Sequence, residues 1–287
     1  MKETLRIAFV DFWPEWSQED FITPILEKYY NVVNDLINPD VVFHSIFNGQ
    51  RDIKKYKCKR VLFLGENWRP KQFSPDYSIS FDPTDDTNFR LPLWQAYILL
   101  NPAYLDSLLN RVNHTEFDRF ASFTVSNGAN FIRNGMFNQL SQYKTVYSYG
   151  RYSTNNYELQ NLSQGKYWRD AKNEFFNKFK HKFAITYENT KYPYYCTEKL
   201  MDGFLAGSLP IYWGDPNVNE DWNENAFINM NNYNSNWNFG LEFIKEIDKN
   251  ENKFLEIYNQ PIFTNEQKDK LSNNLGEFET WIIKNIK

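Results

Sequence analysis

The sequence has few residues of the types that build disulfide frameworks, zinc sites and flexible linkers. It contains two cysteines, Cys58 and Cys196, and three histidines, His44, His114 and His181. Two cysteines are too few for a disulfide framework, and no histidine has a cysteine or histidine neighbour at zinc-ligand spacing. With 11 glycines and 12 prolines among 287 residues, no long flexible linker is evident.

Long apolar runs are also missing. No stretch approaches the roughly 18 apolar residues that a membrane-spanning helix needs, and the early run "IAFV" is too short for the core of a signal peptide. From the sequence alone we therefore expect a cytoplasmic protein without a transmembrane anchor.

The chain has no excess of positive charge. Its 32 Lys and Arg residues are outnumbered by 36 Asp and Glu, the formal net charge is -4, and the basic residues are scattered. A nucleic-acid-binding protein is expected to show a basic footprint, so we expect no nucleic-acid partner.

Several nucleotide, hydrolase and metal motifs are absent. The sequence has no phosphate-binding GxxxxGK[ST] loop, no GxGxxG, no GxSxG and no DxD motif. Asp85 and Asp86 are adjacent in "PTDDTN", which we interpret as a solvated turn. We therefore expect no metal ligands and no required cofactor, although a divalent cation could assist without being essential.

Aromatic residues are abundant instead, at 18% of the chain. We attribute most of this total to an AT-rich genome, whose codons favour Phe, Tyr, Asn, Ile and Lys together. A few rings near strand ends could stack on sugars. In "VDFWPEW", Trp13 and Trp16 are candidates for such stacking and equally for the core.

Short apolar strand patterns alternate with helical patterns along the chain, which predicts an α/β fold with parallel sheets. The predicted strands cover residues 5–12, 40–47, 60–67, 77–83, 119–127, 145–151, 182–189, 209–215 and 226–233. The predicted helices cover residues 19–31, 91–100, 130–143, 167–181, 197–208, 239–258 (as one or two helices) and 265–287.

The alternation runs twice, with a polar break at residues 110–118. This predicts two Rossmann-like domains, 1–115 and 116–265, facing each other across a ligand cleft. A C-terminal helical segment, 266–287, could pack back on the first domain. Parallel sheets bind ligands beyond the carboxyl ends of their strands. The residues at those ends are Asp11, Glu66, Ser126, Asn127, Glu188, Asn189, Gly214 and Asp215.

The segment "ENTKYPYYCTEKLMDGFLAGSLPIYWGD" carries the strongest chemical signal. Thr197 is a good N-cap residue, which places Glu198 and Lys199 in the first turn of a helix. A helix N-terminus together with a lysine suits a phosphate group. Glu198 could accept hydrogen bonds from sugar or ribose hydroxyls, and a nucleoside diphosphate sugar needs both kinds of group. The alternative is a capped helix with ordinary surface charges.

Two further residues follow predicted strands. Arg133, near the start of a helix in "VSNGANFIRNGMF", could hold phosphate oxygens or pair with a surface carboxylate. Glu66, in "KRVLFLGENWRP", could act as a general base, or pair with Arg69, or accept backbone N–H groups. Position alone does not separate these alternatives.

Together these segments resemble the α-1,3/4-fucosyltransferases, glycosyltransferase family 10. The stretch "FAITYENTKYPYYCTEKLMDGFLAGSLPIYWGDPNV" is similar to that family's hallmark segment. "RVLFLGEN", "LPLW", "FASFTVSN" and "IRN" match further family blocks in the same order. The resemblance covers roughly residues 5–259 and is weak in the last thirty.

The resemblance implies a GT-B-type fold of two Rossmann-like domains and transfer of fucose from GDP-β-L-fucose to a hydroxyl, with inversion. It assigns Glu66 as the general base on the acceptor side, where Trp13 is a candidate stacking ring. It assigns the diphosphate to Arg133 and Lys199. Asn189, Tyr195 and Glu198 correspond to other donor contacts.

The resemblance leaves several questions open. The acceptor could be N-acetyllactosamine, lactose or a surface-polysaccharide unit, and the linkage α-1,3 (which we favour) or α-1,4. Another GDP-sugar donor and a non-catalytic glycan-binding protein are the alternatives. The sequence shows no heptad repeats and no strongly basic amphipathic tail, so we expect a soluble bacterial-type protein without membrane docking by that route. The oligomeric state is not indicated.

Overall fold

The computed structural model describes residues 2–233 and 236–286. The chain divides into two compact units, Met1–Pro102 with Lys268–Lys287, and Ala103–Gln267. This division falls earlier than the expected boundary at 115/116. The reason is helix α4 (Ala103–Leu109), whose Tyr104 packs within the second unit. The Tyr104 hydroxyl accepts a hydrogen bond from Asn173 at 3.1 Å, and the Arg169 guanidinium lies 5.6 Å from its ring.

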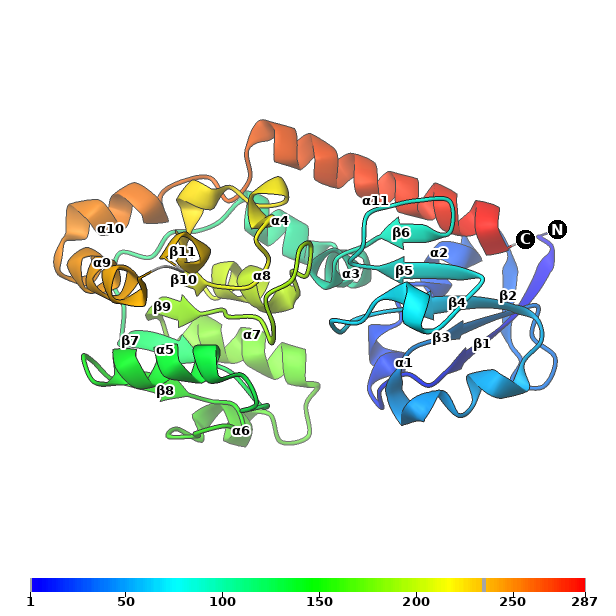
Figure 1. The fold of residues 1–287 in the computed structure, drawn as a ribbon, viewed down its shortest axis with the longest axis horizontal. Coiled ribbons are helices and arrows are strands. Elements are labelled where there is room, and N and C mark those ends of the chain that lie inside the picture. Colours follow the sequence, from blue (N-terminus) through cyan, green and yellow to red (C-terminus); the bar gives the residue numbers. More distant parts are fainter. Residues whose placement is uncertain (1, 234–235, 287) are drawn as a thin grey trace. The chain divides into compact units, whose positions relative to one another are not determined.

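The first unit contains a six-stranded parallel sheet in the order β2-β1-β3-β4-β5-β6 (Figure 1). The chain order of strands therefore reverses between β1 and β3. The strands are β1 (Thr4–Val10), β2 (Asn31–Asn34), β3 (Val41–His44), β4 (Lys59–Phe63), β5 (Tyr77–Ser80) and β6 (Asn88–Arg90). All four strands predicted in this part of the sequence are present, and the short edge strands β2 and β6 were not predicted.

The helix predicted at 19–31 is interrupted. It is replaced by α1 (Trp16–Glu19), α2 (Thr23–Glu27) and the start of β2. The Asp20 carboxylate accepts hydrogen bonds from the backbone N–H groups of Ile22 and Thr23 at 2.9 and 3.0 Å, which interrupts the helical conformation before α2. Pro24 then lies in the first turn of α2, where its missing N–H costs no helical hydrogen bond.

The last helix, α11 (Asn265–Ile286), packs on the sheet of the first unit, where it runs beside β6 (Figure 1). Its buried Phe278 ring lies 5.3 Å from the Phe89 ring of β6. Its Glu279 carboxylate forms a 2.5 Å ion pair with Lys28. Helix α3 (Leu93–Leu100) follows β6, and its Gln95 side chain accepts a hydrogen bond from Asn274 of α11 at 2.6 Å.

The second unit contains a five-stranded parallel sheet in the order β11-β10-β9-β7-β8, so the chain order reverses between β7 and β9. Its strands are β7 (Arg119–Phe123), β8 (Val146–Ser148), β9 (His181–Ile185), β10 (Leu209–Tyr212) and β11 (Ile228–Asn229). Its remaining helices are α5 (Phe131–Ser141), α6 (Glu158–Leu162), α7 (Trp168–Lys178), α8 (Glu198–Leu205), α9 (Trp237–Lys249) and α10 (Glu251–Tyr258).

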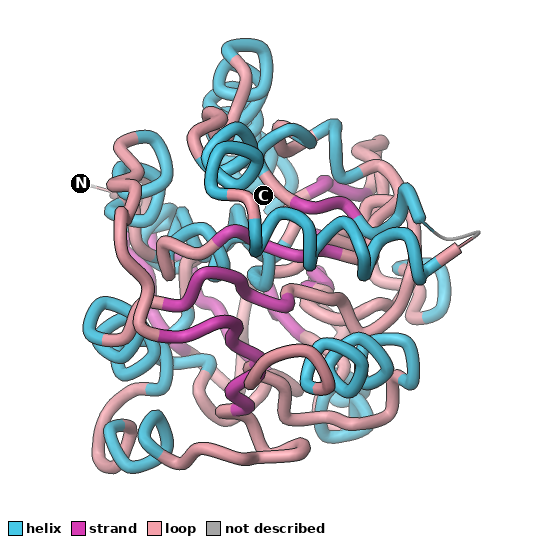
Figure 2. Tube along the Cα trace, turned by 90° about the vertical axis from the view of Figure 1, so that its left-hand side faces the viewer, coloured by secondary structure: helices cyan, strands magenta, loops and turns pink. Residues whose placement is uncertain are grey.

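Both faces of the second sheet are covered by helices, as the tube view also shows (Figure 2). On β7, Ala121 and Phe123 join the core formed with α5, α9 and α10. Ser122 points to the other face, toward α7 and α8. This covering explains why the strands read as short, nearly continuous apolar runs.

Two features of the second unit differ from the sequence prediction. The predicted strand at 226–233 shortens to β11, and α4 and α6 were not predicted. The segment 239–258 forms two helices, separated at Asn250, whose side chain accepts the backbone N–H of Lys253 at 3.1 Å and caps α10.

Among the described residues, no helix is both long enough and apolar enough to cross a membrane.

Candidate functional site

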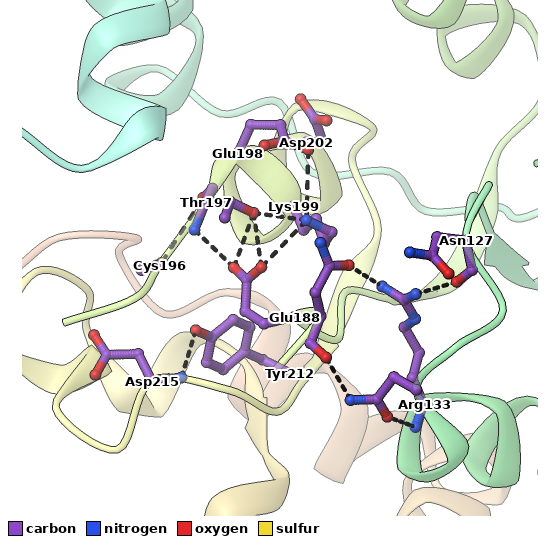
Figure 3. Close-up of polar contacts among 12 residues, drawn as sticks. Asn127, Arg133, Glu188, Cys196, Thr197, Glu198, Lys199, Asp202, Tyr212 and Asp215 are labelled. Carbon is purple, nitrogen blue, oxygen red and sulfur yellow. Dashed lines mark hydrogen bonds and ion pairs between the residues drawn. The ribbon is translucent and has the colours of Figure 1, made fainter. Parts of the chain in front are cut away.

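Arg133 and Asn189 meet at the point where the strand order of the second sheet reverses. Arg133 follows β7 in the first turn of α5, and Asn189 follows β9. The Arg133 side chain is buried, with 2% of the residue exposed. Its Nη1 donates to Asn189 Oδ1 at 2.6 Å, and its Nη2 donates to the backbone carbonyl of Asn127 (Figure 3). Ligands bind at such reversal points in parallel sheets.

Asn130 strengthens this junction and was not singled out from the sequence. It is the N-cap of α5, and its Oδ1 accepts the backbone N–H of Arg133 at 2.8 Å. Its Nδ2 donates to the Asn189 carbonyl at 2.6 Å. The preference of asparagine for N-caps was the available signal. Asn130 therefore fixes the start of α5 against the loop after β9.

Glu198 and Lys199 occupy the first turn of α8, as predicted, and Thr197 is its N-cap residue. The role expected for the Thr197 side chain is wrong, because its hydroxyl makes no capping hydrogen bond to the helix. The hydroxyl instead donates to Glu188 Oε2 at 2.7 Å and accepts from Lys199 Nζ at 2.8 Å. It is therefore a bridge between an acid and a base.

Glu188 lies at the centre of this cluster and is completely buried. Its Oε1 accepts the backbone N–H of Thr197 at 2.7 Å, and its Oε2 lies 3.2 Å from Lys199 Nζ (Figure 3). Burial raises the pKa of Glu188 above its ordinary value, although the Lys199 charge and the Thr197 N–H act in the opposite direction. The sequence marked Glu188 as a strand-end residue but did not indicate its burial.

Glu198 faces a second group of charges, contributed by α7. Arg169 and Lys172 form ion pairs with Asp202 of α8 at 3.0 and 2.5 Å. Burial opposes ionisation of Glu198, but Lys199, Arg169 and Lys172 outweigh it and lower its pKa to about 2. The spacing of Arg169 and Lys172, three residues apart on a helix, was the unused signal for this network.

A small cavity lies behind Lys199, between the sheet and the two helices. It has a volume of about 40 Å³ and its lining includes Lys172, Lys199, Asp202 and Gly203. This is room for a few water molecules at most. The cavity is therefore too small to enclose a nucleotide.

Tyr195 is held by a turn that depends on a second buried carboxylate, Asp215. Tyr194 has a left-handed backbone with φ of 67°, and its N–H donates to Asp215 Oδ1 at 2.7 Å. The Asp215 N–H in turn donates to the Tyr212 hydroxyl at 3.0 Å. Tyr195 itself is fully buried. Glu188 and Asp215 thus both hold the C-terminal part of the loop between β9 and α8, through Thr197 and Tyr194.

Glu66 and Trp13 belong to the first unit. Glu66 follows β4 and is partly buried, and its backbone carbonyl accepts the Trp68 N–H at 2.7 Å. The partly buried Trp13 donates from Nε1 to Glu19 at 2.8 Å. Trp16 is buried in the core, which excludes it as a sugar-stacking ring.

Asp11, also considered as a strand-end residue, has a structural contact. It has a φ of 57°, and its carboxylate accepts the Ile53 N–H at 2.9 Å. Cys58 and Cys196 are both free. Among residues 2–233 and 236–286, no three His, Cys, Asp or Glu side chains are grouped to hold a metal ion. The charges at the reversal point are instead those of Arg133 and the α7–α8 network.

Two protein-family descriptions match the chain. The N-terminal domain of α-(1,3)-fucosyltransferase FucT matches residues 7–97, and the C-terminal domain of glycosyltransferase family 10 (fucosyltransferase) matches residues 115–270. The first match lies within the first unit, and the second covers the second unit from residue 115 to its end and includes Arg133, Asn189 and Lys199.

Individual relatives agree with these matches. The chain is 28% identical to the α-(1,3)-fucosyltransferase FucT of Helicobacter pylori, over 95% of its own length and 63% of that protein. It therefore spans a little under two thirds of that relative. It is 38% identical to human 4-galactosyl-N-acetylglucosaminide 3-α-L-fucosyltransferase 9 over 27% of its length and 22% of that enzyme.

Solved structures show the same fold. A crystal structure of an α1,3-fucosyltransferase aligns with a TM-score of 0.76 at 23% identity, over 98% of this chain and 90% of that one. One determined with GDP-fucose gives a TM-score of 0.72 at 24% identity, over 98% and 91%. The fold is thus the GT-B type, as predicted. The family match over residues 115–270, more than half of the chain, shows that the chain belongs to glycosyltransferase family 10, the fucosyltransferases.

Proposed function

We propose that this protein transfers L-fucose from GDP-β-L-fucose to a hydroxyl of a GlcNAc or Glc residue, in α-1,3 linkage and with inversion. The observation that carries the proposal is the convergence of Arg133 and Lys199 on the Glu188–Asn189 segment at the reversal point of the second sheet. Arginine and lysine are the side chains that bind phosphate groups through charge-assisted hydrogen bonds.

The surrounding residues support a nucleoside diphosphate sugar rather than a bare anion. Glu198 stays ionised at neutral pH, since its pKa is lowered to about 2, and can accept hydrogen bonds from ribose or sugar hydroxyls. Asn189 and Tyr195 precede it on the loop between β9 and α8. We assign Asn189, Tyr195 and Glu198 to the donor, beside Arg133 and Lys199. Because the Tyr195 side chain is fully buried, its role in this proposal is through the backbone and the shape of the loop.

Glu66 supplies the remaining function in this proposal. It takes the proton from the acceptor hydroxyl as that oxygen attacks the anomeric carbon and the bond to GDP breaks. The transition state resembles an oxocarbenium ion. GDP needs neutralisation of its developing charge rather than a proton, so Arg133 and Lys199 take the place of a catalytic acid. We assign Trp13 to the acceptor side, together with Glu66.

The acceptor in this proposal is an N-acetyllactosamine- or lactose-like glycan. The names of the relatives support it, since one is described as acting on 4-galactosyl-N-acetylglucosaminide. A surface-polysaccharide acceptor or a different GDP-sugar would use the same cations. We propose that catalysis requires no cofactor and takes place in the cytoplasm.

The proposal is tested by donor and acceptor panels. GDP release is followed with GDP-fucose, GDP-mannose and UDP-sugars, each with N-acetyllactosamine, lactose or no acceptor, and the products are analysed by mass. We expect GDP-fucose to be preferred and a fucosylated glycan to form. Glycan binding that GDP does not affect, with no turnover of any donor, would contradict the proposal and indicate a non-catalytic glycan-binding protein.

A further inference from the structure

We propose that Glu188 is a positioning residue, which holds Lys199 in the orientation that receives the donor diphosphate. This inference rests on the proposed function, because it specifies how one of its two cations is placed. Glu188 is completely buried and does not reach the ligand itself. It acts through Thr197 and Lys199.

The contacts of Glu188 account for both carboxylate oxygens. Oε1 accepts the Thr197 backbone N–H at 2.7 Å, and Oε2 accepts from the Thr197 hydroxyl at 2.7 Å and from Lys199 Nζ at 3.2 Å. Lys199 Nζ also donates to the Thr197 hydroxyl at 2.8 Å. One buried carboxylate therefore holds both the Lys199 ammonium and the N-cap residue of α8.

Lys199 lies at the boundary between this buried acceptor and the surface. Its side chain is 21% exposed, whereas that of Glu188 is 0% exposed. Glu198 lies 3.7 Å from the ammonium, and Asp202 lines the cavity behind it. Asp202 is already paired with Arg169 and Lys172, so Glu198 is the carboxylate toward which the ammonium would turn if Glu188 did not accept its hydrogen bond. In this proposal Glu188 holds the ammonium against the attraction of Glu198.

Packing explains why the carboxylate stays in place. A Cβ atom added at Gly214 would lie 2.4 Å from Glu188 Cγ and 2.7 Å from its Cβ. Only the absence of a side chain at 214 lets the strand end pass directly over Glu188. The glutamate, the threonine, the lysine and the glycine of this segment therefore form one physical unit.

The first test uses Glu188→Gln, which keeps the size of the side chain but has only one acceptor oxygen. In the wild type the Thr197 N–H and the Lys199 ammonium bind different carboxylate oxygens, so in the variant the amide NH2 group would face one of these two donors. We expect GDP affinity, measured by calorimetry, to fall about tenfold or more, as for the loss of a hydrogen bond to a charged group. Guanosine, which lacks phosphate, should bind with a change of less than about twofold.

The second test combines Glu188→Gln with Lys199→Ala. If Glu188 acts through Lys199, Glu188→Gln should lower GDP affinity by less than about twofold in the Lys199→Ala background. Thr197→Val, which removes only the bridging hydroxyl, should lower GDP affinity, and Thr197→Ser should restore it. These changes in GDP affinity distinguish a positioning role of Glu188 from a general loss of stability, which would not depend on Lys199 or be reversed by serine at position 197.

Asp248→Asn is the matched control. Asp248 is a buried carboxylate in the same unit, with 3% of its side chain exposed and ion pairs to Lys144 and Lys182. It should lower the unfolding temperature without selectively weakening GDP relative to guanosine. Equal losses from Glu188→Gln in the wild-type and Lys199→Ala backgrounds, or equal losses for GDP and guanosine, would overturn the inference while leaving the proposed function intact. A wild-type protein that does not bind GDP would overturn both.

Discussion

Arg133 Nη1 lies 2.6 Å from Asn189 Oδ1, so the first turn of α5 is joined by hydrogen bonds to the residue that follows the Glu188 anchor. Asn130 makes a second connection, to the Asn189 carbonyl at 2.6 Å. The guanidinium is therefore held in place within the protein before any ligand arrives. A cation fixed in this way stabilises a developing charge without reorganising during the reaction.

Arg133→Lys should lower both stability and turnover. Lysine cannot reproduce the fork that reaches Asn189 and the Asn127 carbonyl together. We expect a loss of about 1.5–3 kcal/mol in the free energy of unfolding, as for hydrogen bonds to a charged group. Urea unfolding and steady-state kinetics measure the two effects. Arg60→Lys, at an exposed ion pair with Asp76, is the control and should change neither appreciably.

Lys199→Ala should lower kcat more than it raises KM for the donor. If the ammonium stabilises the leaving diphosphate, its removal costs about 2–4 kcal/mol of transition-state stabilisation. The control is Lys245→Ala, whose surface lysine pairs with Glu242 at 2.7 Å. Unchanged turnover in Lys199→Ala would remove this lysine from the mechanism.

Gly214→Ala tests the close approach to Glu188. The added Cβ would lie 2.4 Å from Glu188 Cγ, so we expect a loss of about 1–3 kcal/mol from overpacking. Gly276→Ala is the matched substitution in α11, where an added Cβ meets nothing within 4 Å. Alanine should stabilise that helix by up to about 1 kcal/mol. Thermal unfolding should show a lower unfolding temperature for Gly214→Ala and an equal or higher one for Gly276→Ala. A Gly214→Ala protein as stable as the wild type would contradict the close packing of Gly214 on Glu188.

The free energy of unfolding should fall as the pH is lowered from 6.5 toward 4. Burial lowers the pKa of His44 and of His181 to about 4, and the Arg119 charge adds to the effect at His181. Between about 4 and the ordinary value of 6.5 the unfolded chain binds more protons, so acid favours unfolding. Each histidine should account for a loss of about 2 kcal/mol in the free energy of unfolding when the pH is lowered from 7.5 to 5.

His181→Gln separates one of these contributions. His181 Nε2 lies 2.7 Å from the Tyr149 hydroxyl and Nδ1 lies 3.0 Å from the Phe179 carbonyl. An uncharged glutamine can make both kinds of contact without binding a proton. Its stability measured by urea unfolding should therefore depend less steeply on pH than that of the wild type. An identical slope would mean that His181 does not titrate in this range.

The positions of the candidate site residues in the fold could be predicted because the two sheets are parallel. Glu66, Arg133, Asn189 and Lys199 all follow strands or begin helices, and the structure places each one there. Periodicity is sufficient for such positions, since it fixes where a strand ends. It does not say which polar residues point inward, which is why the complete burial of Glu188 was not foreseen.

The elements that the sequence did not indicate depend on tertiary contacts. Strand β2 is paired along β1 and carries exposed residues, so its apolar pattern is weak. The Thr197 hydroxyl has a stronger partner in Glu188 than in the helix N–H groups, and this overrides its usual role as a cap. Both outcomes come from neighbours distant in sequence, which local propensity does not contain.

The most direct test of the proposed activity is one incubation of the purified protein with GDP-fucose and N-acetyllactosamine, with Glu66→Gln in parallel. GDP release and product mass are measured together. We predict a fucosylated product in the wild type and a rate lower by about 10²–10⁴-fold or more in the variant. No GDP release by the wild type, together with no GDP binding by calorimetry, would contradict the assignment of this chain as a fucosyltransferase that uses GDP-fucose.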